Sequence, residues 1–69
     1  MRKFIVLFEK SKDGYDAYVP DLPGCVAFGD TKEETEELIF ESIKFHVEGL
    51  EREGELIPQA VTDSEVMVI

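Results

Sequence analysis

The stretch YVPDLPGCVAFGDT, residues 18–31, decides how this chain folds because it concentrates the residues that constrain a backbone. It holds two of the three prolines, two of the five glycines and the single cysteine. Pro20 and Pro23 have no amide hydrogen to give to a β-ladder, and Gly24 permits backbone angles that other residues resist. The stretch therefore predicts a tight turn that interrupts any strand running into it.

Two strands are expected before this turn and one directly after it. KFIVLFEK (residues 3–10) is rich in β-branched and aromatic residues and apolar on both alternating faces, which is typical of a central strand covered on both sides. YDAYV (15–19) follows the dipeptide Asp13-Gly14, which favours a hairpin. CVAF (25–28) predicts the third strand, and EVMVI (65–69) predicts a last one.

Residues 31–54 predict one long helix. Thr31 and Glu34 have the spacing of a capping box, and Gly54 is typical of a helix C-terminus. Six residues recur at helical spacing and are expected to face the core: Ile39, Ser42, Ile43, His46, Val47 and Leu50. The opposite side is mainly acidic and is expected to be solvated.

The expected fold class is α+β, a single domain over residues 1–69 with the order β-β-β-α-β. One helix would pack on a four-stranded mixed sheet with the first strand in its middle, the second strand antiparallel on one side and the last strand parallel on the other. One helix covers only one face of such a sheet, and an exposed apolar face usually marks an association surface. We therefore expect a homodimer or a higher homo-oligomer.

The charge distribution argues against several classes of function. The net charge is −9, although residues 1–12 carry four basic residues against one acidic residue, a balance of +3. An acidic surface repels phosphates, so direct nucleic-acid binding is not expected, whereas a basic protein partner would be attracted. No apolar run approaches the length of a membrane span, and the run at residues 4–8 is too short for a signal peptide, so a cytoplasmic protein is expected.

The reactive side chains form no recognisable catalytic or metal site. Cys25 would need a nearby base or cation to act as a nucleophile, but its loop neighbours are acidic, so a buried structural cysteine is favoured. His46 falls on the helix face expected to be buried, and neither Asp16, Asp21 and Asp30 nor the glutamates of the first helical turn have the spacing of metal ligands. We expect no catalytic residue, no metal and no cofactor, and hence not an enzyme.

The chain resembles the HicB family of small antitoxins. The resemblance rests on a Tyr-x-Pro-Asp-Leu-Pro-Gly-Cys turn, a Gly-Asp-Thr helix start and a Gly-Glu-x-Ile-Pro segment after the helix. The matching positions are Tyr18, Pro20, Asp21, Leu22, Pro23, Gly24, Cys25, Gly29, Asp30, Thr31, Gly54, Glu55, Ile57 and Pro58. The motif itself is interpreted as a turn and a helix cap.

This resemblance implies a fold akin to part of a ribonuclease H-like sheet without its catalytic carboxylates. It also implies an antitoxin of a type II toxin–antitoxin pair, which binds and occludes a small basic HicA-like toxin that cleaves mRNA. The chain is similar to short stand-alone members, since longer antitoxins of the family carry a C-terminal DNA-binding domain that is not recognisable here. DNA binding is therefore not expected to carry over.

Two functions stay open from the sequence. The chain is either such an antitoxin or a solitary oligomeric domain that binds and regulates another protein without a toxin partner. On charge alone, Asp21, Glu37, Glu41 and Glu48 are candidate partner contacts. A solvated helix face is the simpler interpretation of the three glutamates.

Overall fold

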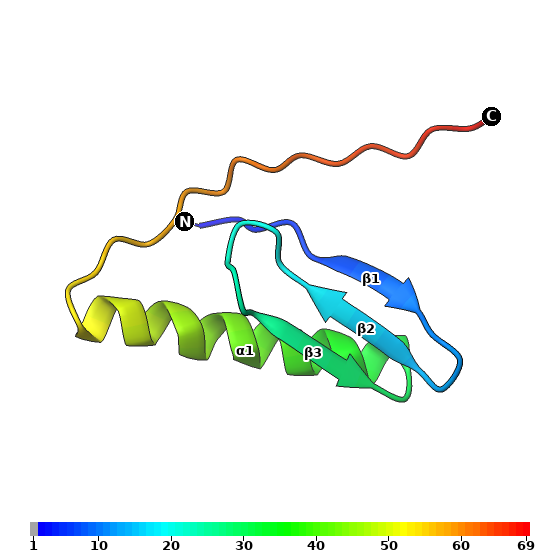
Figure 1. Cartoon of the computed structure of the whole chain (residues 1–69), viewed down its shortest axis with the longest axis horizontal. Coiled ribbons are helices and arrows are strands. Elements are labelled where there is room, and N and C mark those ends of the chain that lie inside the picture. The colour runs from blue at the N-terminus through cyan, green and yellow to red at the C-terminus, as the bar shows by residue number, and fades with distance from the viewer. Residues whose placement is uncertain (1) are drawn as a thin grey trace.

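The computed structural model describes residues 2–69, which contain three strands and one helix (Figure 1). Strands β1 (Leu7–Lys10), β2 (Tyr15–Tyr18) and β3 (Val26–Gly29) form an antiparallel sheet in the order β1-β2-β3. Helix α1 (Lys32–Arg52) packs on one face of this sheet, against β2 and β3. The α+β class and the order of the first four elements agree with the expectation from the sequence.

The loop between β2 and β3 closes with hydrogen bonds that end β2. The amide of Val19 donates to the carbonyl of Cys25 across the loop at 3.2 Å, and within the loop the amide of Leu22 donates to Val19 at 3.0 Å. Gly24 has a φ of 86°, in the left-handed region that glycine tolerates best. This tight path places Leu22 and Cys25, which are 0% and 2% exposed, inside the core.

The same loop explains why β1 is shorter than expected and lies at the edge of the sheet. The sequence predicts a central strand over residues 3–10, but only Leu7–Lys10 pair with β2. Leu7 lies opposite Tyr18, so the residues before Leu7 would have to pair with residues after Tyr18, where the chain already turns. Because β2 forms a hairpin with each neighbour, β2 is the central strand.

Residues 65–69, for which the sequence predicts a fourth strand, form no strand in the structure. The chain beyond α1 is extended, passes beside the N-terminal segment and then runs away from the sheet (Figure 1). Residues 66–69 are each at least 70% exposed. The expected four-stranded mixed sheet is therefore not formed, because this course carries residues 65–69 away from the edge of β1.

The register sorts the side chains of the sheet onto two faces. Phe8, Ala17 and Ala27 lie opposite one another across the three strands and belong to the face that α1 covers. The buried core consists of Ala17, Val19, Leu22, Cys25 and Ile39, with Phe4, Val6, Phe8, Ala27, Ile43 and Val47 packed around it. The opposite face carries the exposed side chains of Tyr18, Val26 and Phe28. As expected from the sequence, the single helix leaves one apolar sheet face open.

Both ends of α1 are capped in the way the sequence predicts. The hydroxyl of Thr31 accepts a hydrogen bond from the amide of Glu34 at 3.1 Å. The carboxylate of Glu34 in turn accepts from the amide of Asp30 at 2.8 Å, one residue earlier than in a standard capping box. At the other end Gly54 has a φ of 68°, and the amides of Gly54 and Glu55 donate to carbonyls of the last turn in a Schellman arrangement.

Thr35 is a fully buried polar residue that the helical periodicity did not assign to the core. Its hydroxyl donates to the carbonyl of Thr31 at 2.7 Å, which meets the requirement that a buried polar group be hydrogen-bonded. Its side chain lies against Gly29, where an added Cβ would come within 2.6 Å of the hydroxyl oxygen. Gly29 therefore allows β3 to approach α1 closely.

We expect Gly29→Ala to lower the free energy of unfolding by about 1–3 kcal/mol, because the added methyl group overpacks the contact with Thr35. The matched control is Gly49→Ala in α1, where a Cβ would meet nothing within 4 Å and alanine is favoured by about 0.5–1 kcal/mol. Urea denaturation followed by circular dichroism measures both variants. A Gly29→Ala protein as stable as the parent would contradict the close approach of β3 and α1.

Candidate functional site

The PDLPGC segment, residues 20–25, is a turn. Some of its side chains pack in the core, and another contacts the C-terminal segment. Leu22 is fully buried in the core cluster that includes Ile39 of α1, and the sulfur of Cys25 lies 3.3 Å from the hydroxyl oxygen of Ser42 on α1. Cys25 is thus the buried cysteine that the sequence predicts. Its burial among core residues gives this side chain a packing role.

Asp21 points out of the same turn and holds the C-terminal segment. Its carboxylate accepts three hydrogen bonds: from the amide of Thr62 at 2.9 Å, from the hydroxyl of Thr62 at 2.7 Å and from the amide of Val61 at 3.1 Å. Hydrogen bonds to an ionised carboxylate are stronger than those between neutral groups. We call this set of contacts, made by Asp21, Val61 and Thr62, the Asp21 clasp.

The clasp lowers the pKa of Asp21. The amide of Thr62 has the largest effect, its hydroxyl the next largest, and the amide of Val61 adds to both, while desolvation acts in the opposite direction. A carboxyl group whose pKa is depressed by folding stabilises the folded state above its ordinary pKa of 3.8, and this contribution is lost as the pH falls through the lowered value. At neutral pH Asp21 is therefore ionised and able to accept all three hydrogen bonds.

This finding bears on Asp21 as a candidate partner contact. Both of its carboxylate oxygens already accept hydrogen bonds from the chain's own residues. The sequence offered no signal for this role, because the donors lie 40 and 41 positions further along. The clasp fixes the position from which the rest of the C-terminal segment departs.

The other candidate partner contacts, Glu37, Glu41 and Glu48, lie exposed on the solvent side of α1. The helix carries seven glutamates and only three basic residues; the glutamates are Glu33, Glu34, Glu36, Glu37, Glu41, Glu48 and Glu51, and the basic residues are Lys32, Lys44 and Arg52. Phe40, which is 63% exposed, lines a shallow hollow together with Glu36, Glu37 and Glu41. We call this hollow and Glu48 the acidic face of α1.

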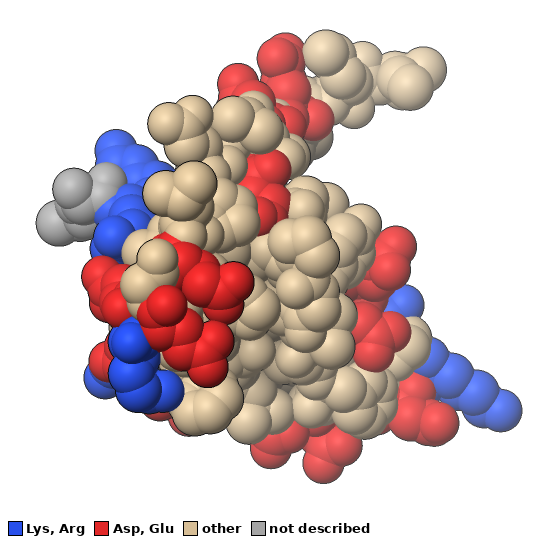
Figure 2. Space-filling model, turned by 60° about the vertical axis from the view of Figure 1, so that its left-hand side comes forward, with Lys and Arg blue, Asp and Glu red and all other residues tan. Residues whose placement is uncertain are grey.

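The charged groups are unevenly spread over the surface. Figure 2 shows acidic side chains around a broad uncharged area, with basic side chains gathered at the periphery of the view. Among residues 2–69 one ion pair forms, between Arg2 and Glu51 at 3.4 Å, and both of its side chains are about half exposed. An exposed pair of this kind contributes little stability, and within residues 2–69 the other glutamates of α1 form no ion pair.

Within the described part of the chain, no three His, Cys, Asp or Glu side chains converge in the geometry of a metal site. Over the same residues, α1 has neither the length of apolar sequence nor the low charge that crossing a bilayer requires. The acidic side chains instead lie side by side along α1, in an arrangement suited to contact with an extended basic surface.

Residues 4–68 match the family described as the HicB-like antitoxin of bacterial toxin–antitoxin systems. This chain belongs to the HicB-like antitoxin family. The match confirms the resemblance drawn from the PDLPGC turn and the helix start. In structure, a chain of the solved HicA3 and HicB3 toxin–antitoxin complex is similar to it with a TM-score of 0.71 and 30% identity, over 87% of this chain and 70% of that chain.

Relatives in sequence come from a phage, an archaeon and a cyanobacterium. A 14.9 kDa protein of Haemophilus phage HP1 is 42% identical over 55 residues, which cover 80% of this HicB-like chain but only 41% of the phage protein. UPF0150 proteins of Thermoplasma acidophilum and Synechocystis are 41% and 42% identical, over 84% and 72% of their own lengths. The chain thus spans less than half of the phage relative and most of the two others.

We expect Asp21→Ala to release the C-terminal segment, because it removes the shared acceptor of three hydrogen bonds. The protection of the Val61 and Thr62 amides against hydrogen exchange should fall at least about tenfold at neutral pH. In the parent protein the same protection should fall as the pH drops below 3.8 and then through the lowered pKa of Asp21, at which its carboxylate in the clasp takes up a proton.

The matched control for this experiment is Asp63→Ala. Asp63 lies in the same segment, but its carboxylate accepts only from the amide of the adjacent Ser64 among the described residues. This variant should leave the protection at Val61 and Thr62 unchanged. Equal loss in both variants would mean that the clasp does not hold the segment.

Proposed function

We propose that this chain neutralises a small basic toxin of the HicA type by covering the surface on which that toxin binds RNA. The proposal is supported by membership of the HicB-like antitoxin family and by the likeness to a chain from the HicA3 and HicB3 complex. A ribonuclease must present cations to the phosphates of its substrate. A protein of net charge −9 that offers carboxylates to those cations competes directly with the RNA.

The observation that carries the proposal is the acidic face of α1. Glu37 and Glu41 are four residues apart and Glu48 follows seven residues later, so that the three carboxylates lie along one side of the helix. Phe40 adds an exposed aromatic ring beside Glu37 and Glu41. Interfaces typically combine a buried aromatic anchor with a charged rim, and this face offers both.

The toxin would meet this surface in the cytoplasm, where mRNA is available for cleavage. The first test is to express the small open reading frame adjacent to this gene, alone and together with this chain. Growth arrest by the neighbour, relieved by this chain in a complex that co-purifies, is the expected result. A harmless neighbour, or arrest that this chain does not relieve, would favour the alternative of a solitary oligomeric regulatory domain.

We expect the double substitution Glu37→Lys and Glu41→Lys to slow association with the toxin at least about tenfold, because it reverses the charges that attract a basic surface. Affinity of the parent complex should fall as the salt concentration rises. Stopped-flow and calorimetric measurements at two salt concentrations give both quantities.

The matched control is Glu53→Lys with Glu55→Lys, which makes the same change of charge at exposed positions beyond the end of α1. The control should retain most of the association rate, since its charges lie outside the acidic face of α1. Equal slowing by both pairs would assign the attraction to net charge alone, and no slowing by either would place the toxin elsewhere.

A further inference from the structure

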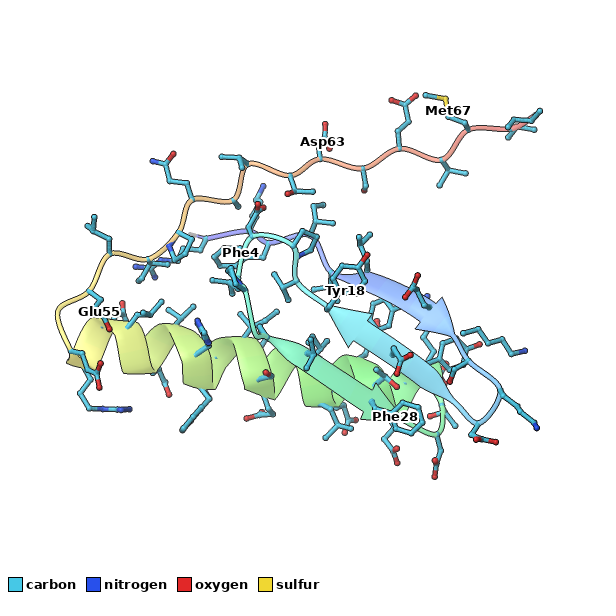
Figure 3. The ribbon with its side chains drawn as sticks, viewed as in Figure 1. Phe4, Tyr18, Phe28, Glu55, Asp63 and Met67 are labelled. Carbon is cyan, nitrogen blue, oxygen red and sulfur yellow. The ribbon has the colours of Figure 1, made fainter. Side chains whose placement is uncertain are left out.

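The apolar residues 66–69 do not pack against the rest of the single chain. Val66, Met67, Val68 and Ile69 are 90%, 70%, 95% and 118% exposed. Three of these four residues are β-branched, which is the composition of a strand. Figure 3 shows Asp63 and Met67 on an extended segment that stands clear of the sheet and of α1. An exposed apolar run of this kind is typical of a segment that pairs with another surface.

The outer side of β1 is an open edge of the sheet, with backbone groups that an added strand could pair with. The amide of Ser11 donates to the carbonyl of Gly14 at 2.7 Å, and hydrogen-bonded pairs alternate along an antiparallel ladder. Glu9 and Leu7 therefore direct their backbone groups to β2, whereas Phe8 and Lys10 direct theirs outward. Within residues 2–69 no strand pairs with this outer side of β1. Open edges of this kind accept strands from other chains.

The C-terminal segment and the N-terminal part of the chain that contains β1 carry opposite net charges. Residues 55–69 contain Glu55, Asp63 and Glu65 and no lysine or arginine, which gives this segment a charge of −3. Residues 1–12, which include β1, carry +3. Residues 65–69 and β1 belong to these two oppositely charged stretches, although β1 itself, with Glu9 and Lys10, carries no net charge.

We infer that residues 65–69 add to the outer edge of β1 in a second copy of this chain, so that two copies exchange strands. The Asp21 clasp holds residues 61–62 at the β2–β3 loop, and the segment beyond it leads away from the chain's own β1 (Figure 1). Each copy supplies one C-terminal segment and one outer edge of β1, so a two-fold arrangement pairs both, and the outer side of β3 remains an edge of the sheet. The partner's strand completes a four-stranded sheet in each half.

This inference is independent of the proposed toxin, because it concerns only copies of the chain itself. It also assigns to the C-terminal segment a role that the acidic face of α1 does not involve. The competing surface for self-association is the open sheet face with Tyr18, Val26 and Phe28. Strand exchange and face-to-face packing differ in which residues hold the dimer together.

The first experiment measures the oligomeric state by sedimentation equilibrium without any toxin. The full chain should be a dimer, and the double variant Val66→Asp with Val68→Asp should raise the dimer dissociation constant at least about a hundredfold. The control, Leu56→Asp with Gln59→Asp, makes the same charge change at exposed positions before the clasp and should stay dimeric. Circular dichroism should show both variants folded, because none of these residues lies in the core.

The second experiment locates residues 65–69 in the dimer. Chains carrying ¹³C-labelled methionine methyl groups are mixed with unlabelled chains and allowed to exchange, and Met67→Leu assigns the signal of Met67. Nuclear Overhauser effects from the Met67 methyl group to β1 of the unlabelled chain are expected. Effects confined to one chain would mean that the segment folds back on its own sheet and would overturn the inference.

Two further results would also overturn it. A monomeric parent protein with a solvent-exposed Met67 methyl group would show that the segment pairs with nothing. A dimer that survives Val66→Asp with Val68→Asp, but dissociates with Tyr18→Asp, would assign self-association to the open sheet face instead. Each of these outcomes leaves the toxin-binding proposal untouched, since no toxin is present in either experiment.

Discussion

The turn at residues 20–25 buries the side chains of Leu22 and Cys25 and keeps the charged side chain of Asp21 outside the core. Much of the remaining structure depends on this division. Leu22 and Cys25 enter the core, which forces the chain into a tight loop closed by the Val19–Cys25 hydrogen bond. Asp21 is left on the outer side, where its carboxylate holds the C-terminal segment. One short loop therefore shapes the core, the length of β1 and the course of the chain after α1.

The domain balances a small core against a large amount of apolar surface that stays exposed. A chain of this size buries only about 60% of the surface that its unfolded state exposes, so five residues make up the buried apolar cluster. The polar group inside, the hydroxyl of Thr35, is hydrogen-bonded, and no buried side-chain polar atom of the described residues lacks a partner. The apolar side chains on the open sheet face and in the C-terminal segment therefore stay exposed because the core is too small to enclose them.

The surface separates into regions of different chemistry. The acidic face of α1 offers carboxylates and one aromatic ring, which suits a basic partner. The edge of β1 and residues 65–69 offer backbone groups and apolar side chains, which suit another strand. Because these regions lie on different elements, the proposed strand exchange and the proposed toxin contact would use different residues.

The sequence by itself determined the local features: the hairpin at Asp13-Gly14, the capped ends of α1, the packing of Ile39, Ile43 and Val47 against the core, the buried Cys25 and the family. Each of these depends on residues within a turn or two of one another, so spacing and residue type were sufficient to predict them. Only the tertiary structure decided the edge position of β1, the contact of Thr35 with Gly29, the Asp21 clasp and the lack of a fourth strand among residues 2–69. These features depend on strand register and on contacts between distant parts of the chain, which in the clasp are up to 41 residues apart. A periodic pattern in the sequence cannot specify such contacts, because it carries no information about which elements meet in space.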